Sequence, residues 1–267
     1  MEDINILKQI GNTPLIRLKQ ASDFTGCNIY GKAEYFNPGE SVKDRAALFI
    51  IEDAIKNKKI KKGGLVIEGT AGNTGIGLAI VTKAYGLGLK IVIPNTQSIE
   101  KKEILRKLGA ELIEVDAAPY SSSNNYIKKS KKIAEELSGT NENGVLWANQ
   151  FDNIANTESH IQTTSKEIWT QTAGQVHGFV CAVGTGGTLA GISIGLKEKN
   201  KNIKIALSDP IGSSLYSYIK FNKLESAGNS ITEGIGTGRV TRNFEKALVD
   251  DAFQVTDEEA LNIIFKL

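Results

Sequence analysis

"LVIEGTAGNTGIGLAI", residues 65–80, predicts a short buried strand, a loop of glycine, threonine and asparagine, and the start of a helix. Residues 178–191, "GFVCAVGTGGTLAG", repeat this order of elements. A glycine-rich turn at a helix N-terminus presents several backbone N–H groups to one anion, and the helix dipole strengthens the attraction. Two such turns predict two anionic groups held near one site, and a phosphate and a carboxylate would fit.

The rest of the chain alternates between strand-like and helix-like patterns, which indicates a parallel α/β architecture. The expected strands are 65–68, 90–94, 111–115, 145–148, 178–183 and 203–208. The expected helices are 42–57, 75–86, 98–108, 125–138, 153–171, 188–199 and 257–266. Both glycine-rich turns then follow strands, at the carboxyl edge where open α/β sheets bind ligands. Thr256 and Glu259 have the spacing of a capping box for the last helix.

A lysine occupies an unusual position in "YFNPGESVKDRAAL", residues 35–48. Ser41 and Asp44 have the S-x-x-D spacing of a helix capping box, and apolar residues recur behind them at helical intervals. Lys43 is therefore expected in the first turn, where unpaired N–H groups and the helix dipole disfavour a positive charge. An amine destabilised as a cation is a better nucleophile, as Schiff-base chemistry needs. From these residues alone, a surface lysine near a helix start remains the alternative.

Several motifs resemble those of a known family. "NPGESVKDR" around Lys43, "GTAGNTGIG" around Asn73 and "GTGGTLAG" at 184–191 are similar to motifs of the pyridoxal-phosphate enzymes of fold type II, the tryptophan synthase β class. The resemblance narrows to the cysteine synthase, or O-acetylserine sulfhydrylase, branch through "IGNTPLIRL" (10–18), "IPNTQSIEKKEILRKLGAEL" (93–112), "ANQFDN" (148–153) and "TEGIG" (232–236). These motifs follow one another in order over essentially the whole chain.

The resemblance implies a fold, a cofactor and a set of site residues. The fold would have two parallel-sheet α/β domains: a smaller one over 44–150 with the substrate-carboxylate loop, and a larger, cofactor-binding one over 1–43 and 151–267. Lys43 would form the Schiff base with pyridoxal 5'-phosphate and act as the base at the substrate Cα, while Asn73 would bond the ring hydroxyl oxygen. The cofactor phosphate would be held by Gly184, Thr185, Gly186, Gly187 and Thr188. The substrate would be bound by Thr70, Gly72, Thr74 and Gln150, with Gly234 lining the pocket.

The chemistry implied is β-replacement, in which acetate leaves O-acetyl-L-serine and sulfide adds to form L-cysteine. A cystathionine β-synthase-like or serine/threonine dehydratase-like lyase is an alternative within the same fold. A shortened, weakly active or inactive homologue that still binds a ligand or partner is a third possibility. The resemblance also implies small-molecule substrates and a homodimer.

The chain departs from the family pattern in two places. Ala71 stands where many members carry serine, which removes one hydroxyl from the carboxylate site. Family members also continue into a "GGSSG" segment whose serine contacts the pyridine nitrogen, whereas this chain ends at Leu267. We therefore expect a larger domain without its last part, and a compromised enzyme whose last helix exposes the apolar residues Ala260, Leu261, Ile264 and Phe265.

Composition indicates a soluble, cytoplasmic enzyme without nucleic-acid or membrane partners. With 267 residues, 40% hydrophobic content and a net charge of +2, no overall field favours nucleic acid or an acidic membrane. The lysine runs at 56–62 and 128–132 lack interleaved aromatic residues, so we interpret them as solvated faces. The start, "MEDINILKQIG", does not resemble a signal peptide, and no apolar run approaches membrane-spanning length.

The few cysteines and histidines argue against a disulfide framework, a metal site and a Ser-His-Asp triad. Cys27 and Cys181 are too sparse for a disulfide framework. His160 and His177 lack the partners of a metal site or a Ser-His-Asp triad, so we expect no metal and a structural role for each. A dinucleotide fingerprint fails because Leu189 replaces its last glycine, although Asp209 imitates the ribose-binding acid.

Overall fold

The computed structural model describes residues 5–264, and the chain divides into two compact units. Unit 1 consists of the chain up to Gly11 and of Glu34–Asn156, and unit 2 of Asn12–Ala33 and the chain from Thr157 onward. The smaller domain expected over 44–150 lies within unit 1, but its boundaries stay a prediction.

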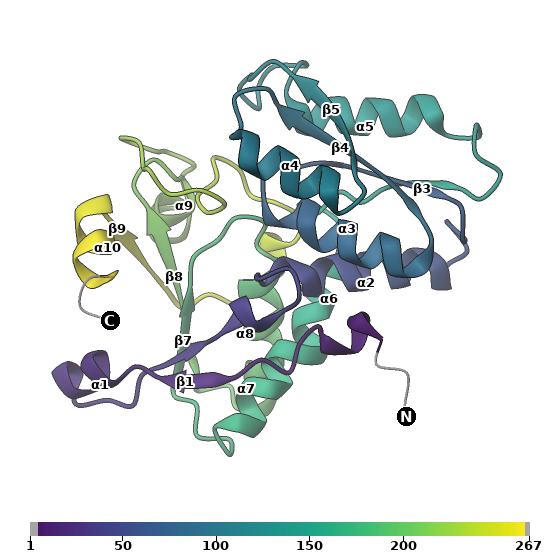
Figure 1. Ribbon diagram of the computed structural model, residues 1–267. Coiled ribbons are helices and arrows are strands. Elements are labelled where there is room, and N and C mark those ends of the chain that lie inside the picture. Colours follow the sequence, from purple (N-terminus) through teal and green to yellow (C-terminus); the bar gives the residue numbers. More distant parts are fainter. Residues whose placement is uncertain (1–4, 265–267) are drawn as a thin grey trace. The chain divides into compact units, whose positions relative to one another are not determined.

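Unit 1 is built on a parallel sheet with strand order β5-β4-β3-β6 (Figure 1). The strands are β3 (Leu65–Gly69), β4 (Gly88–Pro94), β5 (Glu111–Val115) and β6 (Val145–Trp147). The helices are α2 (Lys43–Lys56), α3 (Asn73–Tyr85), α4 (Ile99–Lys107) and α5 (Tyr126–Leu137), with short 3-10 turns at Ile6–Gln9 and Glu34–Phe36.

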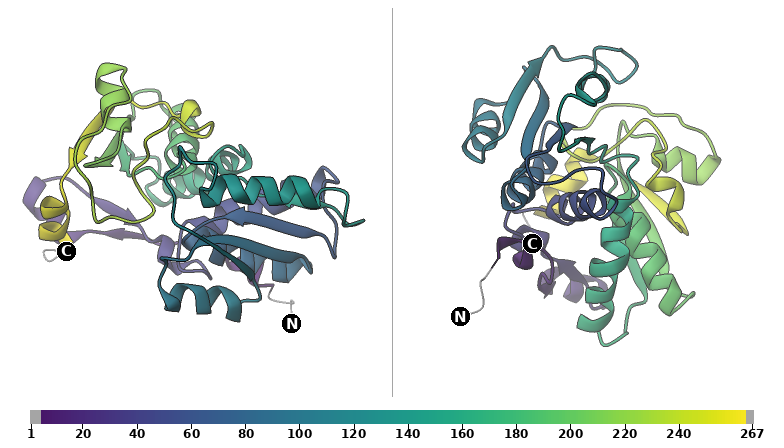
Figure 2. Two further views of the ribbon diagram at one scale, coloured as in Figure 1. Left: turned by 90° about the horizontal axis from the view of Figure 1, so that it is seen from above. Right: turned by 90° about the vertical axis from the view of Figure 1, so that its right-hand side faces the viewer.

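Helices cover both faces of this sheet, as is usual for parallel strands (Figure 2). Side chains alternate between the faces along each strand. Val66 and Ile91 belong to the core formed with α2 and α3, whereas Ile67 and Val92 belong to the core formed with α5. Because β3 is parallel to β4 and β6, the loop between the end of β3 and α3 lies at the carboxyl edge of the sheet.

Unit 2 contains a second parallel sheet, with strand order β7-β8-β9, and an antiparallel pair, β1-β2. The strands are β1 (Leu15–Arg17), β2 (Tyr30–Lys32), β7 (Gly178–Cys181), β8 (Lys204–Pro210) and β9 (Asp251–Val255). The helices are α1 (Lys19–Thr25), α7 (Ser165–Gln171), α8 (Gly187–Lys199), α9 (Leu215–Phe221) and α10 (Asp257–Ile264), with a 3-10 turn at Phe244–Lys246. Leu189, Ile192 and Leu196 of α8 share a core with Ile205 and Leu207 of β8.

A π-helical segment, His160–Thr164, joins α6 (Ala155–Ser159) to α7. Within unit 2 the chain from Thr157 to Ser165 packs closely on α8. A Cβ added at Gly191 would lie 2.4 Å from Thr157 O, and one added at Gly195 would lie 2.1 Å from Ser165 Oγ. The two glycines, four residues apart on one face of α8, therefore permit this close approach.

The α/β fold with parallel sheets is confirmed, and each expected strand and helix is present with its ends shifted by only a few residues. The single helix expected over 153–171 is interrupted by the π segment, and the short elements β1, β9, α1 and α9 were not expected, whereas β2 is the strand expected after Cys27. The last helix is described to Ile264, so positions 265 and 266, including Phe265, lie outside the described residues. Within the described residues no helix is long and apolar enough to cross a membrane.

The two capping boxes have different outcomes. The box at α10 is confirmed, because Glu259 N–H donates to Thr256 Oγ1 at 3.1 Å and Thr256 N–H donates to Glu259 Oε2 at 2.9 Å. The box at α2 is wrong in its pairing. Ser41 Oγ accepts from Lys43 N–H at 3.3 Å, whereas the Asp44 side chain accepts from Gly39 N–H instead.

Candidate active site

Lys43 is the first residue of α2, and its side chain is half-buried. The residue before it, Val42, provides no side-chain cap for the helix. The sequence prediction that Lys43 lies in the first turn of a helix is therefore confirmed, and the backbone at this end of α2 has unpaired N–H groups and the positive end of the helix dipole. A positively charged side chain is generally less favourable in the first turn of a helix than in its last turn.

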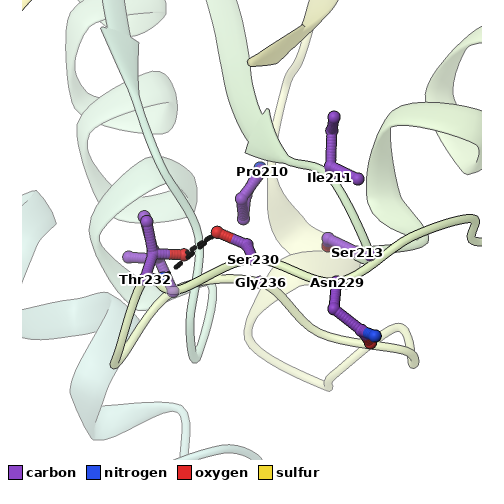
Figure 3. A pocket seen from close by; sticks show the side chains of 9 residues that line it. Pro210, Ile211, Ser213, Asn229, Ser230, Thr232 and Gly236 are labelled. Atoms are coloured by element: carbon purple, nitrogen blue, oxygen red, sulfur yellow. Dashed lines mark hydrogen bonds between the residues drawn. The ribbon is translucent and has the colours of Figure 1, made fainter. Parts of the chain in front are cut away.

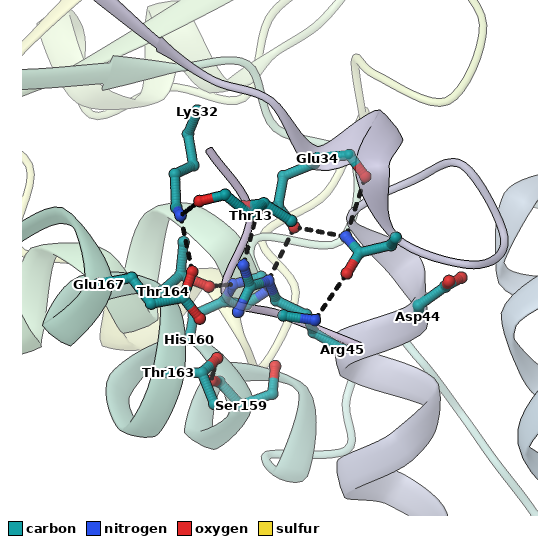
Figure 4. A network of polar contacts seen from close by, with 12 residues as sticks. Thr13, Lys32, Glu34, Asp44, Arg45, Ser159, His160, Thr163, Thr164 and Glu167 are labelled. Carbon is teal, nitrogen blue, oxygen red and sulfur yellow. Dashed lines mark hydrogen bonds and ion pairs between the residues drawn. The ribbon is translucent and has the colours of Figure 1, made fainter. Parts of the chain in front are cut away.

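A polar network fixes the segment that leads into α2 (Figure 4). Arg45 is only 1% exposed, and its guanidinium forms a bidentate ion pair with Glu34 at 2.7 and 2.8 Å. The Asn37 side-chain amide donates to Glu34 Oε2 at 2.9 Å and to Ser41 O at 3.1 Å, and its oxygen accepts from Gly11 N–H at 2.8 Å. Bidentate, charge-assisted pairs hold their partners in one geometry. The residues around Lys43 are thus held from both sides.

Asp44, next to the lysine, is completely buried. Its Oδ2 accepts from Gly39 N–H at 2.5 Å, and a Cβ added at Gly39 would lie 2.4 Å from its Oδ1. Burial raises the pKa of Asp44 to about 6, and the charge of Glu34 also contributes to this rise. Asp44 also lies against α3, since a Cβ at Gly77 would be 3.1 Å from both Asp44 Cα and Lys43 O. The starts of α2 and α3 are therefore packed together.

The loop after β3 brings together the residues expected to bind the substrate carboxylate. Asn73 opens α3 and is exposed, and no side chain caps this helix at Gly72. Thr70 Oγ1 accepts from Gly72 N–H at 3.2 Å. Thr74, which is 2% exposed, donates from its hydroxyl to Gln150 Oε1 at 2.6 Å. The distant Gln150 is thus joined to the loop, and these residues share unit 1 with Lys43.

Glu68, two residues before this loop, is a buried carboxyl for which the sequence suggested no role. It is 1% exposed, and the backbone N–H groups of Asn149 and Gln150 and the Gln150 side chain hydrogen-bond to it. Burial nevertheless raises its pKa to about 8, so it is largely protonated at pH 7.

In unit 2, the glycine-rich loop after β7 meets the "TEGIG" segment. A Cβ at Gly184 would lie 2.3 Å from Gly234 O, and Gly236 N–H donates to Val183 O at 2.8 Å. Gly186 has φ 88° and stands before α8 without a side-chain cap. Only glycine adopts this conformation readily, and a Cβ there would also lie 2.7 Å from Phe244 N. The predicted residues Gly184–Thr188 and Gly234 are therefore neighbours.

His160 contacts the glycine-rich loop, which the sequence did not suggest. Its ring is 1% exposed; Nδ1 lies 2.9 Å from Thr164 Oγ1, and Nε2 lies 3.2 Å from Thr188 Oγ1. His160 is the first residue of the π segment, a helix distortion that is frequent at functional sites. The contact with Thr188 agrees with the structural role that the sequence predicts for His160, because it orients the Thr188 hydroxyl.

A cavity of about 160 Å³ lies beside the "TEGIG" segment (Figure 3). It is lined by Pro210, Ile211, Gly212, Ser213, Asn229, Ser230, Thr232, Ile235 and Gly236. Ser230 and Thr232 hydrogen-bond to each other at 2.8 Å, and Asp257 of α10 accepts from Ile231 N–H at 3.0 Å. The cavity wall is thus held by polar contacts that reach the last described helix.

The sequence showed no sign of several residues that contact the expected site residues or the segment before Lys43. Glu34, Asn37 and Glu68 were not singled out, Asp44 was assigned to a capping box, and the contact of His160 with Thr188 was not foreseen. The available signal was the presence of charged side chains inside apolar or motif-rich stretches, as with Glu68 in "LVIEG". Among residues 5–264, no group of three or more His, Cys, Asp and Glu side chains is placed to hold a metal ion.

Two parallel-sheet α/β units, a lysine at a helix start and glycine-rich turns at helix N-termini define the class of fold type II pyridoxal-phosphate enzymes. The sequence matches the family described as "Pyridoxal-phosphate dependent enzyme" over residues 6–267, and the chain belongs to this family.

Curated relatives include cysteine synthases. The chain is 49% identical over 262 residues to cysteine synthase 1 of Neurospora crassa, covering 96% of this chain and 68% of that protein. It is 48% identical over 266 residues to cysteine synthase 1 of Emericella nidulans, covering 98% and 70%.

Solved structures agree in fold. A hydrogen sulfide-producing enzyme from Fusobacterium nucleatum superposes with a TM-score of 0.86 at 35% identity, covering 99% of this chain and 84% of that one. O-acetylserine sulfhydrylase isoform 3 from Entamoeba histolytica gives 0.85 at 36% identity, covering 97% and 75%.

The residues present fit pyridoxal phosphate. The start of α8 lacks a side-chain cap and follows a glycine with positive φ, an arrangement that suits a phosphate dianion. A lysine at a helix start suits covalent attachment to a carbonyl carbon. When bound, the cofactor supplies an electron sink for the carbanion formed at the substrate Cα.

Proposed function

We propose that this chain forms L-cysteine from O-acetyl-L-serine and sulfide by β-replacement. The observation that carries the proposal is the likeness to cysteine synthases at 49% and 48% identity over nearly the whole chain. The grouping of the carboxylate-loop residues in unit 1 and of the phosphate-loop residues in unit 2 supports it.

The residues divide the work as follows. The Lys43 amine would hold the cofactor covalently and would take the proton from the substrate Cα, after which acetate would leave from Cβ. Thr70, Gly72, Thr74 and Gln150 bind the substrate carboxylate, and Asn73 donates to the ring hydroxyl oxygen of the cofactor. Gly184, Thr185, Gly186, Gly187 and Thr188 bind the phosphate, while Gly234 lets the backbone approach the pocket.

The test is direct. The purified chain, loaded with pyridoxal phosphate, is given O-acetyl-L-serine and sulfide, and L-cysteine and acetate are measured together. Equal amounts of both products, absent in Lys43→Ala, are the expected result. Acetate release without L-cysteine, accompanied by pyruvate, would instead indicate a lyase.

A second candidate differs in the sulfur nucleophile. The chain is 38% identical to a Bacillus subtilis protein named O-acetylserine dependent cystathionine beta-synthase. We therefore include homocysteine as a competing acceptor. Preferential formation of cystathionine over cysteine at equal acceptor concentrations would favour this candidate.

The cytoplasmic location and the homodimer are proposed from the sequence and the resemblance alone. Sparse cysteines, Cys27 and Cys181, agree with a reducing compartment. Light scattering of the purified protein and fractionation of cells that produce it test these two proposals, and a monomer or an organellar location would overturn them.

A further inference from the structure

Glu68 occupies a position where a carboxyl is costly. Within β3 it pairs with Ile91 of β4, and Ala148 follows β6 at the neighbouring strand position; both neighbours are completely buried. Burying a carboxyl among such side chains is unfavourable unless hydrogen bonds compensate. Its presence two residues before the substrate loop therefore needs an explanation.

The hydrogen bonds of Glu68 come from a single segment, the chain that leaves β6. The chain turns at Asn149, which has φ 49°, and the N–H groups of Asn149 and Gln150 both reach the Glu68 carboxyl. The Gln150 side chain adds a third hydrogen bond. The other carboxyl oxygen, Oε2, has no hydrogen-bond partner within the part of the chain that the structure describes.

Gln150 links this carboxyl to the substrate loop. Its Oε1 accepts from Thr74 Oγ1 at 2.6 Å, so it is the amide nitrogen that donates to Glu68. The contact to Glu68 thus decides which end of the Gln150 amide faces Thr74. Glu68, Gln150 and Thr74 form one buried relay, with exposed fractions of 1%, 5% and 2%.

We propose that Glu68 is a positioning residue that fixes the Gln150 amide and the Thr74 hydroxyl for the carboxylate of an amino-acid substrate. This rests on the proposed function, since it takes Thr74 and Gln150 to bind that carboxylate. A neutral Glu68 orients the relay without placing a second negative charge near the bound carboxylate.

Ionisable groups on α5 and α2 also bear on the local charge. The first turn of α3 carries no acidic residue, and the neighbours from β4 and β6 are apolar. α5 contributes the Tyr126 hydroxyl, whose pKa is raised by burial and by the charge of Glu68. α2 contributes Asp44, which lies against Gly77, and Lys43 beside it. Loss of the Glu68 proton would therefore add an anion in a site of low dielectric, close to a bound carboxylate.

The experiment measures binding of L-serine, which has the carboxylate and amine of the proposed substrate but lacks its acetyl leaving group. The full chain loaded with pyridoxal phosphate is titrated between pH 7 and pH 9, and the visible absorbance change gives Kd. Glu68→Gln keeps the shape and stays neutral, whereas Glu68→Ala removes the contact. Tyr126→Phe removes the neighbouring ionisable group and serves as the matched control.

Expected results separate the proposal from its alternatives. At pH 7, Glu68→Ala raises Kd more than about tenfold, and Glu68→Gln restores most of the affinity. From pH 7 to pH 9, the Kd of the parent and of Tyr126→Phe rises about tenfold more than that of Glu68→Gln. The pyridoxal phosphate affinity of both Glu68 variants stays close to that of the parent.

A rise of Kd with pH in Glu68→Gln equal to that of the parent would overturn the proposal while leaving the proposed function standing. If Glu68→Ala does not fold, the proposal is tested by comparing the pH dependence of Kd in Glu68→Gln with that in the parent. A parent that binds cofactor but gives no response to L-serine would overturn the proposed function, and this inference with it.

Discussion

Lys43 stands at a helix start, and polar side chains with several hydrogen bonds hold the chain on both sides of it. Glu34, Asn37 and Arg45 hold the backbone around it, while Asp44 ties it to Gly39. These contacts fix the backbone from which the Lys43 side chain starts, and catalysis depends on orientation of reacting groups. If Lys43 has the proposed role, neighbours that take no part in the chemistry position its backbone.

At this scale we predict that borohydride reduction of the cofactor-loaded protein labels Lys43 and no other lysine. Peptide mass mapping locates the label, and Lys43→Ala should lose its visible absorbance on dialysis. A label on another lysine, or persistent reducible absorbance in Lys43→Ala, would contradict the assignment.

Gly39→Ala should affect Lys43 indirectly, through its neighbour Asp44. The new Cβ would lie 2.4 Å from Asp44 Oδ1, so the carboxyl or the turn must move. We expect a loss of about 1–3 kcal/mol of stability, together with weaker cofactor binding. Gly238→Ala is the matched control, because its Cβ meets no atom within 4 Å. Equal stability of the two variants in urea unfolding would refute the prediction.

Glu68 should make the free energy of unfolding depend on pH. Its pKa in the folded protein is about 8, above the ordinary value of 4.5, so folding favours the protonated form. The contribution is fully present below about pH 4.5 and is lost as the pH rises to about 8, at about 1.4 kcal/mol per pH unit. In urea unfolding, the free energy of unfolding of the parent should therefore fall between pH 6 and pH 8 relative to that of Glu68→Gln, at about 1.4 kcal/mol per pH unit. Parallel curves would show that Glu68 is ionised in the folded protein.

At the scale of elements, prediction from sequence succeeds where a pattern is long and local, and fails where a distant contact decides. Each glycine-rich strand-loop-helix unit was predictable, because its residues act on their own backbone. The predicted capping box of α10 is present. The Asp44 side chain instead accepts a hydrogen bond from the Gly39 N–H, because this N–H competes with the predicted partner, Ser41. The strand β1 has only three residues and is mostly exposed, so its sequence shows no apolar period.

The N-terminus of α8 offers a prediction of its own. Thr188→Asp places a negative charge in the first turn, where the phosphate is expected, without adding a Cβ to a glycine. The affinity for pyridoxal phosphate should fall more than tenfold, which corresponds to about 1.4 kcal/mol. Thr188→Ser is the control, as it keeps the hydroxyl near His160. Unchanged affinity in Thr188→Asp, measured by fluorescence titration, would remove this loop from the phosphate site.

For the molecule as a whole, the fold class and the order of the main elements followed from the sequence, and the supporting network did not. The pairs Glu68–Gln150 and His160–Thr188 join residues that are far apart in the chain, so no local pattern reveals them. Their identification requires the tertiary structure.

Cofactor binding should stabilise the whole chain. A ligand that binds only the folded state adds about 2.7 kcal/mol when its concentration is 100 times Kd. We expect pyridoxal phosphate to raise the melting temperature clearly and pyridoxal, which lacks the phosphate, to raise it less. Differential scanning fluorimetry with both compounds tests this, and equal shifts would argue against a phosphate site.

The π segment has a consequence for how this chain can change over evolutionary time. A π turn holds one residue more than a regular helix, so deleting one residue from 160–164 would restore regular geometry and rotate the preceding side chains by about 100°. His160 would then leave Thr188, and Thr157 or Ser165 would lose its place against Gly191 or Gly195. The extra residue and the two glycines therefore constrain one another. Loss of the extra residue, or replacement of either glycine, would therefore pass through a protein in which the segment 157–165 no longer packs closely on α8.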